Sequence, residues 1–349
     1  MLALVTEPAV PHSTRVEDVP EPHDTAGVLL RVLEVGVCGT DREISEGLFG
    51  VPADGTSLVL GHESLAMVER DGHGFSRGDL VTATVRRSCQ HCLACEDGAP
   101  DSCLTGDYSE RGITRLDGFA RELIVEDPSQ LIPIPSGLGR LGVLAEPTSI
   151  CERAIRHSLT IGGRQPWQLE RALVVGAGAI GVISTYLLRL AGVEVWTASL
   201  EPSSDLVTAS GAHYVSTKET PLAELHKETG GFDLVISAVP DAQLMADSLG
   251  VLRRSGVACL LGIDGREQKV SIDGPVIGLD AVLENRVLFG SVNAHHQDWL
   301  AAVASLDQAR RRWPDELDSF VGLRVPLDRF QEAFDYRGGV KATLQVSDT

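Results

Sequence analysis

The stretch RALVVGAGAIG, residues 171–181, joins a short aliphatic run to three glycines in the spacing G-x-G-x-x-G. The aliphatic run predicts a buried parallel strand, and an apolar stripe after the glycines predicts an amphipathic helix. Gly176 allows a tight turn, Gly178 lets a pyrophosphate approach the backbone, and Gly181 lets helix and strand pack closely. Because the N–H groups at the helix start would face the phosphates, the stretch predicts dinucleotide binding. The alternative is a bare strand–turn–helix, and a second strand predicted at 193–198 argues against it.

The composition excludes several classes of partner. A length of 349 residues favours two domains, and a hydrophobic fraction of 43% is ample for packed cores. The net charge of −19 would repel nucleic acid and anionic lipid, so we expect neither as a partner. No apolar run reaches membrane-spanning length, and the start MLALVTEPAV predicts a first strand rather than a signal peptide. We therefore expect a cytoplasmic protein.

Two different patterns divide the chain. Up to about residue 135, short strands punctuated by glycine and proline predict a compact, barrel-like β domain. After about residue 145, helical and strand patterns alternate, which predicts an α/β domain with a doubly wound parallel sheet. The alternating elements include a helix at 206–210, a strand at 232–239, a helix at 242–253 and a strand at 256–262.

The C-terminal tail suggests how the two domains are connected. A strand at 343–346 has no helix after it and could return to the β domain. The nucleotide domain would then be an insertion in the other domain. We expect a catalytic domain of residues 1–145 and 294–349, with the dinucleotide-binding domain at 146–293.

Four cysteines crowd one predicted loop, residues 89–103. Cys89, Cys92, Cys95 and Cys103 give the spacing C-x₂-C-x₂-C-x₇-C, which predicts a tetrahedral structural zinc site. Seven cysteines is an odd number, and the clustering of four favours a reducing compartment and a metal over a disulfide framework. The alternatives are a loop of free thiols and, more remotely, an iron–sulfur cluster.

A second group of candidate metal ligands is dispersed in the sequence. Cys38 lies in VCGTD, His62 and Glu63 follow another predicted strand, and Glu146 lies in LAEPTS. Thiolate, imidazole and carboxylate all bind zinc, and three ligands with an open position make a catalytic site. Taken singly, His62 is more often a hydrogen-bonded histidine and Cys38 a small buried hydrophobe, so spacing alone leaves this site open.

These motifs, in their order, resemble the zinc-dependent medium-chain dehydrogenase/reductase family, which is alcohol dehydrogenase-like. The resemblance rests on VCGTD, GHE, the four-cysteine lobe and GAGAIG, and it covers essentially the whole chain. A narrower similarity to the archaeal-type glucose dehydrogenase branch rests on TGDYSERGI at 105–113, DGF at 117–119, LAEPT at 144–148, Asn285 and GSVNA at 290–294.

The resemblance implies a GroES-like catalytic domain, a Rossmann domain and a catalytic zinc. Cys38 and His62 match zinc ligands, and Glu63 and Glu146 match the acidic positions of the branch, with Glu146 bound directly or through water. Thr40 matches the hydroxyl that takes the substrate proton. Zinc would act as a Lewis acid on the substrate oxygen, and a hydride would pass between the carbinol carbon and the nicotinamide.

The resemblance also assigns residues to the substrate and the cofactor. The implied substrate contacts are Thr40, Glu110, Ile150 and Asn293. The implied cofactor contacts are Gly176, Gly178, Ala179, Ile180, Gly181, Ser199, Glu201, Ala238, Val239, Gly262, Ser291, Val292 and Asn293. Where the glucose-oxidising relatives carry polar groups, this chain has Val85, Ile150 and Leu283. Because such a site gains little from the glucose hydroxyls, the pattern argues for a deoxygenated sugar, a cyclitol or a less polar secondary alcohol.

The end of the second predicted strand of the dinucleotide-binding domain bears on cofactor choice. Ser199 stands where an NAD enzyme usually places a carboxylate for the ribose hydroxyls. No arginine or lysine occurs between residues 196 and 205, and the acidic Glu201 would repel a 2′-phosphate. We expect NAD to be preferred, with NADP possible. The alternative is that Glu201 is a solvated turn residue and that selectivity is poor.

The sequence therefore predicts an NAD(P)-dependent zinc dehydrogenase acting on a secondary alcohol, a polyol or a sugar-like substrate. One alternative is a cyclitol or other biosynthetic alcohol dehydrogenase on the same scaffold, and another is a non-catalytic dinucleotide-binding relative. Two zinc ions per chain would favour the enzyme, and one would favour the silent relative. By analogy with the family, we expect a homo-oligomer, either a dimer or a tetramer.

Overall fold

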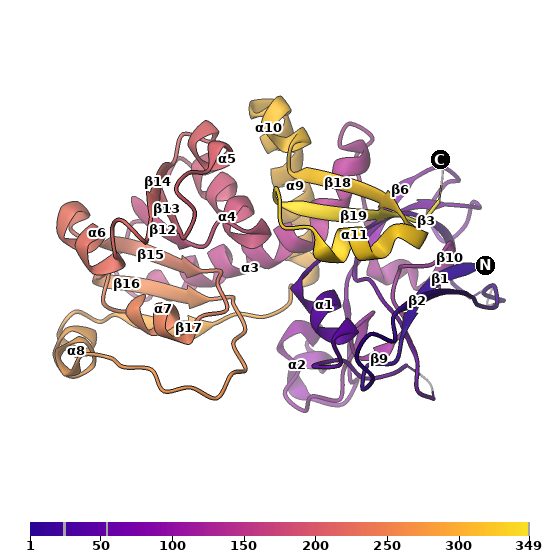
Figure 1. Ribbon diagram of the computed structural model, residues 1–349, viewed down its shortest axis with the longest axis horizontal. Coiled ribbons are helices and arrows are strands. Elements are labelled where there is room, and N and C mark those ends of the chain that lie inside the picture. The colour runs from indigo at the N-terminus through magenta and orange to yellow at the C-terminus, as the bar shows by residue number, and fades with distance from the viewer. Residues whose placement is uncertain (24–25, 54, 348–349) are drawn as a thin grey trace. The chain divides into compact units, whose positions relative to one another are not determined.

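The computed structural model describes residues 1–23, 26–53 and 55–347. The chain divides into two compact units, Met1–Ser149 with Asn293–Thr349, and Ile150–Val292 (Figure 1). Strand β19 (Lys341–Gln345) explains why the first unit has two segments. It pairs antiparallel with β3 (Val28–Val37), so the last strand returns to the N-terminal sheet, as the sequence predicted.

The first unit is built on a seven-stranded sheet with the order β11-β6-β5-β3-β19-β18, in which β10 also pairs with β3. Residues of β3 alternate between buried and half-buried at its start and are all buried further on, because the strand crosses from the edge of the core to its centre. Two three-stranded sheets, β2-β1-β4 and β7-β8-β9, complete the unit.

The remaining strands of this unit are β1 (Leu2–Thr6), β2 (Arg15–Asp18), β4 (Leu58–Val59), β5 (Glu63–Val68), β6 (Leu80–Ala83), β7 (Arg86–Arg87), β8 (Ser109–Arg111), β9 (Arg115–Leu116), β10 (Leu123–Glu126), β11 (Leu131–Pro133) and β18 (Val321–Pro326). Its helices are α1 (Gly39–Ser45), α2 (Leu93–Glu96), η1 (Pro100–Ser102), η2 (Pro128–Gln130), η3 (Gly139–Leu144), α9 (His296–Arg312), α10 (Pro314–Asp318), η5 (Leu327–Arg329) and α11 (Phe330–Asp335). Helix α3 (Ala145–Gly162) begins in this unit and continues into the second.

The second unit is a six-stranded parallel sheet with the order β14-β13-β12-β15-β16-β17. The strands run outward in both directions from β12 and β15, so the predicted doubly wound parallel sheet is confirmed. Its elements are β12 (Arg171–Val175), α4 (Ala179–Leu190), β13 (Glu194–Ser199), α5 (Asp205–Ala209), β14 (His213–Ser216), α6 (Leu222–Thr229), β15 (Phe232–Ser237), α7 (Ala242–Asp247), β16 (Leu252–Leu260), η4 (Val276–Asp280), α8 (Ala281–Leu283) and β17 (Val287–Gly290).

Three predicted elements of this unit have other bounds in the structure: the strand expected at 232–239 ends at Ser237, the strand expected at 256–262 runs from Leu252 to Leu260, and one helix was predicted too long. The helix expected at 242–253 ends at Asp247, and the chain enters β16 at Leu252. Leu249 and Leu252 are buried in the core that covers the sheet. The apolar residues of this segment belong in turn to the end of a helix, a turn and the start of a strand. Hydrophobic periodicity over so short a run cannot tell these apart, so the helix was predicted too long. Within the described ranges, no helix is long and apolar enough to cross a membrane.

Candidate metal centres and active site

The four-cysteine lobe brings its sulfur atoms together. The ligand atoms of Cys89, Cys92, Cys95 and Cys103 all lie within 4.8 Å of one another. Helix α2 begins directly after Cys92, and η1 ends directly before Cys103, so two short helical turns set the spacing of the sulfurs. This set of four sulfurs fits a tetrahedral zinc ion.

The surroundings of these sulfurs differ from one cysteine to the next. A hydrogen bond with the Thr105 hydroxyl lowers the pKa of Cys103 to about 6, and the Leu104 N–H lowers the pKa of Cys92. Burial raises the pKa of Cys95 to about 11. The four sulfurs therefore differ in how readily they lose a proton. A bound metal would favour four thiolates, because thiolates are the metal-binding form.

A second cluster forms at the start of α1. Cys38 is the N-cap of this helix, and its sulfur lies 3.2 Å from His62 Nε2. The Thr40 N–H donates to the same sulfur at 3.2 Å, which places Thr40 in the first turn beside the cluster. Residues 24 positions apart in the sequence thus supply a thiol and an imidazole to one point.

Asp41 completes this cluster, although the sequence analysis did not single it out. The carboxylate is buried, and Oδ2 accepts a hydrogen bond from the Cys38 N–H at 2.9 Å in a capping box. Its Oδ1 lies 3.4 Å from His62 Nδ1. Neither atom has a hydrogen-bond partner among the described residues, but a carboxylate on this side of the ring favours the orientation in which Nε2 faces Cys38. The three-residue spacing of the capping box was the signal that could have found Asp41.

Asp41 and His62 each change the pKa of the other. Burial opposes the charge on His62, but Cys38 and Asp41 together raise the pKa of His62 well above its ordinary value. Burial likewise opposes the charge on Asp41, but the imidazole beside it lowers the pKa of Asp41. The pair therefore favours a charged carboxylate and a strongly basic imidazole.

Glu63 and Glu146 add two buried carboxylates next to His62, and the ligand atoms of these three residues lie within 4.8 Å of one another. Among the residues that the structure describes, Glu63 Oε2 has no hydrogen-bond partner. A side chain at position 36 would clash with this oxygen, because an added Cβ would lie 2.0 Å from it, and Gly36 therefore makes room for the carboxylate. A buried acceptor without a donor beside an imidazole fits a cation.

Lys341 is the counter-charge that the sequence analysis missed. Its Nζ lies 2.6 Å from Glu63 Oε1, and both side chains are 3% exposed or less. Burial opposes the charge on Lys341, but Glu63 raises the pKa of the amine above its ordinary value. Burial also raises the pKa of Glu146 to about 7, and the neighbouring Glu63 carboxylate adds to that rise. One ammonium thus compensates several acids, which leaves room for a further positive charge.

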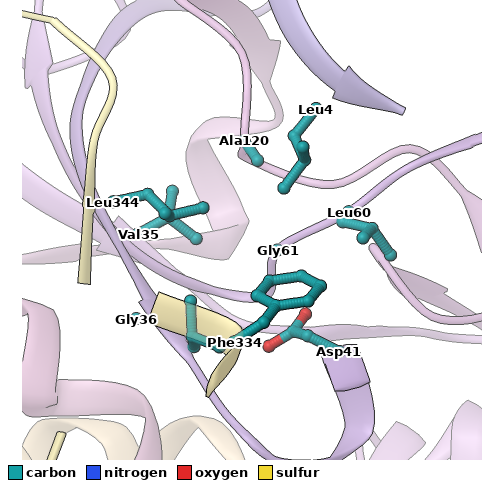
Figure 2. A pocket seen from close by; sticks show the side chains of 10 residues that line it. Leu4, Val35, Gly36, Asp41, Leu60, Gly61, Ala120, Phe334 and Leu344 are labelled. Carbon is teal, nitrogen blue, oxygen red and sulfur yellow. The ribbon is translucent and has the colours of Figure 1, made fainter. Parts of the chain in front are cut away.

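A small cavity lies behind the cluster, between β3 and the C-terminal segment (Figure 2). Asp41 and Phe334 both line it, and its other lining residues are apolar or glycine. Because Asp41 is the one charged group that it offers, the cavity is packing space and does not suit a polyhydroxylated substrate.

Two of the expected substrate residues contact each other. Asn293 Nδ2 donates to Glu110 Oε1 at 2.9 Å, across 183 residues of sequence. Val85, Ile150 and Leu283 are apolar at the positions discussed above. Val85 is buried, Ile150 is half-buried in α3, and Leu283 is exposed in α8.

The glycine-rich stretch forms the turn between β12 and α4 of the second unit. An added Cβ at Gly181 would lie 1.9 Å from the Gly176 carbonyl oxygen, whereas one at Gly178 would meet nothing within 4 Å. The first contact explains the close packing of helix on strand. The open space at Gly178 suits the approach of a phosphate group to the backbone. Ala179 and Ile180 form the first turn of α4.

The other expected cofactor residues of this unit follow the carboxyl ends of the parallel strands. Ser199 ends β13, and the remaining ones come directly after β15, β16 and β17: Ala238, Val239, Gly262, Ser291 and Val292. Asn293 belongs to the first unit. In doubly wound sheets, ligands bind outside this edge, so the sheet brings residues of distant sequence to one binding edge.

Glu201 is tied to its neighbours at this edge. Its carboxylate accepts a hydrogen bond from the Ser199 hydroxyl at 2.5 Å, and its carbonyl accepts one from the Tyr214 hydroxyl at 2.8 Å. The Ser199 bond lowers the pKa of Glu201, and the charge of Lys218 lowers it further. Lys218, two residues after the end of β14, is a positive charge near Glu201 that the sequence around Glu201 does not indicate.

Comparisons with known proteins agree with this geometry. Residues 24–136 match the family model "Alcohol dehydrogenase GroES-like domain", and residues 139–346 match "Glucose dehydrogenase C-terminus". The chain is 37% identical over 342 residues to a glucose 1-dehydrogenase of Methanocella arvoryzae, covering 95% of each protein. It is 34% identical over 343 residues to that of Halobacterium salinarum, again covering 95% of each.

A solved structure supports the same assignment. The glucose dehydrogenase of Haloferax mediterranei in complex with NADP, Zn and gluconolactone matches with a TM-score of 0.91, at 28% identity and with full coverage of both chains. The predicted GroES-like domain is thereby confirmed together with the parallel sheet. The chain belongs to the NAD(P)-dependent zinc dehydrogenases of the medium-chain family and, within them, to the glucose dehydrogenase branch.

Proposed function

We propose that the chain transfers a hydride between a nicotinamide dinucleotide and a carbinol carbon of a sugar-like or polyol substrate. The observation that carries this proposal is the convergence of Cys38, His62, Glu63 and Glu146 within the first unit. Those four side chains would hold the catalytic zinc, either directly or, for Glu146, through water. The four cysteines of the lobe would hold the structural zinc.

Each cofactor would supply chemistry that side chains lack. Bound zinc would act as a Lewis acid, and the nicotinamide would carry the redox equivalents. The residues of the chain do the rest. Asp41 lies beside His62, and the Thr40 hydroxyl relays a proton by accepting it from the substrate hydroxyl while releasing its own to solvent. Glu110 accepts a hydrogen bond from a further substrate hydroxyl, and Asn293 donates one to another.

The substrate is proposed to be a sugar or a close relative of one. The relatives are named glucose 1-dehydrogenases, which supports a glucose-like substrate. Val85, Ile150 and Leu283 would offer glucose fewer hydrogen bonds, so a deoxygenated sugar or a cyclitol should compete well with it. The dinucleotide is proposed to be NAD in preference to NADP, because Glu201 stands close to the expected position of a 2′-phosphate.

The experiment is a panel of sugars, deoxysugars, cyclitols and simple secondary alcohols, assayed at the nicotinamide absorbance with NAD and with NADP. Cys38→Ala should abolish turnover and lower the zinc content from two ions per chain to one, while NADH still binds. Near-normal turnover by this variant would refute the catalytic assignment. A wild-type protein with one zinc and no activity on the panel would favour a silent dinucleotide-binding relative.

We also propose that the chain assembles with copies of itself in a reducing compartment such as the cytoplasm. Strand β17 is the last in its sheet, and the apolar side chains of Leu288 within it and Val292 just after it are exposed. An identical edge in a second copy offers the same unpaired backbone groups and apolar surface, so the contact would be self-complementary. Analytical ultracentrifugation should show an oligomer that Leu288→Asp converts to a monomer. A wild-type monomer would contradict the proposal.

A further inference from the structure

The carboxylate expected to bind substrate is held by an arginine that has no role so far. Arg86 in β7 faces Glu110 in β8 across the antiparallel pair. The Arg86 Nε donates to Glu110 Oε1 at 2.9 Å, and both residues are buried, at 6% and 7% exposed. Asn293 Nδ2 donates to the same oxygen.

The two carboxylate oxygens of Glu110 differ in their hydrogen bonds. Oε1 receives two N–H donors, whereas Oε2 receives none from the described residues. A carboxylate can accept about four hydrogen bonds, so Oε2 keeps its capacity. With Oε1 fixed, the direction of Oε2 is fixed as well.

Two further contacts fix the guanidinium itself. Arg86 Nη1 donates to the Asp101 carbonyl at 2.9 Å, and the guanidinium carbon lies 3.8 Å from the centre of the Tyr108 ring. A planar cation held by two hydrogen bonds and a stacked ring has little rotational freedom. Asp101 lies in η1, two residues before Cys103, so the four-cysteine lobe helps to place Arg86.

We propose that Arg86 is a positioning residue for substrate binding. It neutralises the Glu110 carboxylate in a buried setting and fixes Oε1, so that Oε2 is presented to a substrate hydroxyl. Removing the guanidinium would leave a buried carboxylate without its counter-charge and free to rotate. This proposal rests on the proposed function, in which Glu110 contacts the substrate.

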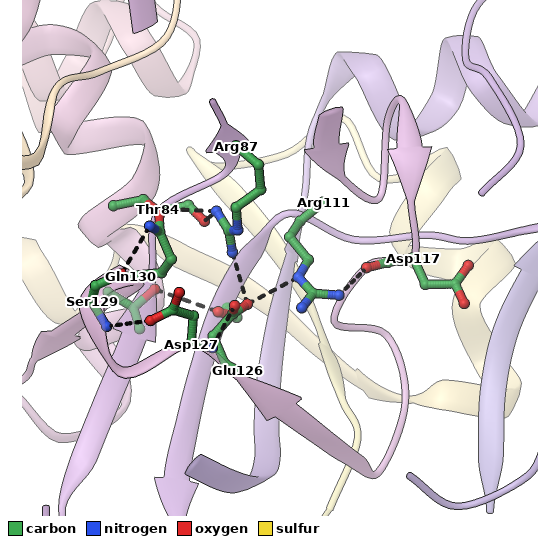
Figure 3. Close-up of polar contacts among 10 residues, drawn as sticks. Thr84, Arg87, Arg111, Asp117, Glu126, Asp127, Ser129 and Gln130 are labelled. Atoms are coloured by element: carbon green, nitrogen blue, oxygen red, sulfur yellow. Dashed lines mark hydrogen bonds and ion pairs between the residues drawn. The ribbon is translucent and has the colours of Figure 1, made fainter. Parts of the chain in front are cut away.

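The test compares two adjacent arginines. Arg87 provides the matched control, because its guanidinium donates to Glu126 at 2.8 Å and to the Thr84 carbonyl at 2.7 Å, in a separate, partly buried network (Figure 3). Arg86→Met should raise KM for the best sugar-like substrate about tenfold or more, with a smaller change in kcat and an unchanged KM for the dinucleotide. Arg86→Lys should regain part of the loss. Arg87→Met should lower Tm and leave both KM values unchanged.

A double-variant cycle separates positioning from simple stabilisation. Glu110→Gln should raise the same KM, and adding Arg86→Met to it should change KM little further, because both changes act on one oxygen. Fully additive effects, or a KM unchanged by Arg86→Met, would overturn the proposal. If Arg86→Met does not fold, Arg86→Lys tests the proposal, because a lysine cannot reach both Glu110 and the Asp101 carbonyl. An unchanged KM for the sugar-like substrate in Arg86→Lys would overturn the proposed role of Arg86.

The failure of the proposed function would look different. A KM unchanged in Glu110→Gln would remove Glu110 from the substrate site, and the role of Arg86 would fall with it. A raised KM in Glu110→Gln together with an unchanged KM in Arg86→Met would overturn the role of Arg86 alone.

Discussion

Asp41 shows how one side chain can serve both a helix and a metal site. Its Oδ2 caps α1 through the Cys38 N–H, while its Oδ1 faces His62 Nδ1. The same carboxylate therefore caps the helix and lies beside the imidazole. Changing Asp41 should disturb ligand geometry before it disturbs the fold of the unit.

We expect Asp41→Asn to weaken zinc binding at the Cys38–His62 site about 10–100-fold, the usual loss when the carboxylate behind a metal-binding histidine is removed. Competition with a chelator of known affinity would measure it. The control is Glu43→Gln, which changes an exposed acid on the same helix and should leave the affinity unchanged. Equal affinities in the wild type and Asp41→Asn would show that His62 is oriented by other contacts.

Glu201 is expected to affect the preference for NAD over NADP. Its carboxylate carries the Ser199 hydrogen bond at the end of β13 and should repel a 2′-phosphate, while Lys218 supplies a nearby positive charge. Glu201→Gln should therefore shift the ratio of kcat/KM for NAD to that for NADP towards NADP by about tenfold. Lys218→Gln should shift the ratio the opposite way. A wild-type enzyme that clearly prefers NADP would contradict the role given to Glu201.

Motifs contained in a short stretch could be predicted from the sequence, but contacts between residues far apart in the sequence could not. The glycine turn and the four cysteines are each contained in a short stretch, so their chemistry could be predicted. Lys341 pairs with Glu63 across 278 residues, and no short-range pattern announces such a contact. The proposed role of Arg86 likewise depends on its contact with Glu110, 24 residues away on a neighbouring strand.

At the scale of elements, the four-cysteine lobe contains few buried apolar side chains besides its cysteines. We expect Cys92→Ser to lower the zinc content by one ion per chain and to reduce Tm, because structural zinc contributes folding free energy. Cys259→Ser is the control. Burial raises the pKa of that thiol to about 12, and it lies in β16, outside both clusters. It should cost stability without loss of zinc, and an unchanged zinc content in Cys92→Ser would refute the lobe assignment.

Lys341 ties the last strand to the first sheet. In the zinc-free protein, Lys341→Met should lower the free energy of unfolding of the first unit by about 3–5 kcal/mol, because it leaves the Glu63 carboxylate buried without a counter-charge. Urea denaturation would measure the change. The double variant Lys341→Met/Glu63→Gln should recover part of it, since no buried charge is then left unpaired. A loss below about 1 kcal/mol, the usual range for exposed pairs, would mean that another cation replaces the amine.

At the scale of the whole molecule, most of the expected metal ligands lie in the first unit and most of the expected dinucleotide contacts lie in the second. The doubly wound unit was predictable as a class, since alternating helices and strands admit few arrangements. The strand order of the β unit was not, because its pairs join strands such as β3 and β19 from opposite ends of the chain. Pairing at that separation leaves no periodic signal in the sequence.

The net charge of −19 supports the last prediction. Excess negative charge destabilises a compact state by self-repulsion, and salt screens that repulsion, with a Debye length of about 10 Å at 0.1 M and about 3 Å at 1 M. Salt also weakens exposed ion pairs, but these contribute little, and the buried pairs at Glu34, Glu63 and Glu126 are screened much less. Repulsion should therefore dominate the response to salt.

We expect salt to raise Tm by several degrees between 10 mM and 0.5 M potassium chloride. A gain of ~1 kcal/mol in the free energy of unfolding corresponds to a rise in Tm of roughly 2–4 °C for a domain of 150–250 residues. Differential scanning calorimetry would measure the rise. The effect should shrink at pH 5, close to the isoelectric point of about 4.9, where the net charge nearly vanishes. A Tm that falls with salt at pH 7 would mean that attractive pairs, and not the acidic excess, dominate the electrostatics of the folded chain.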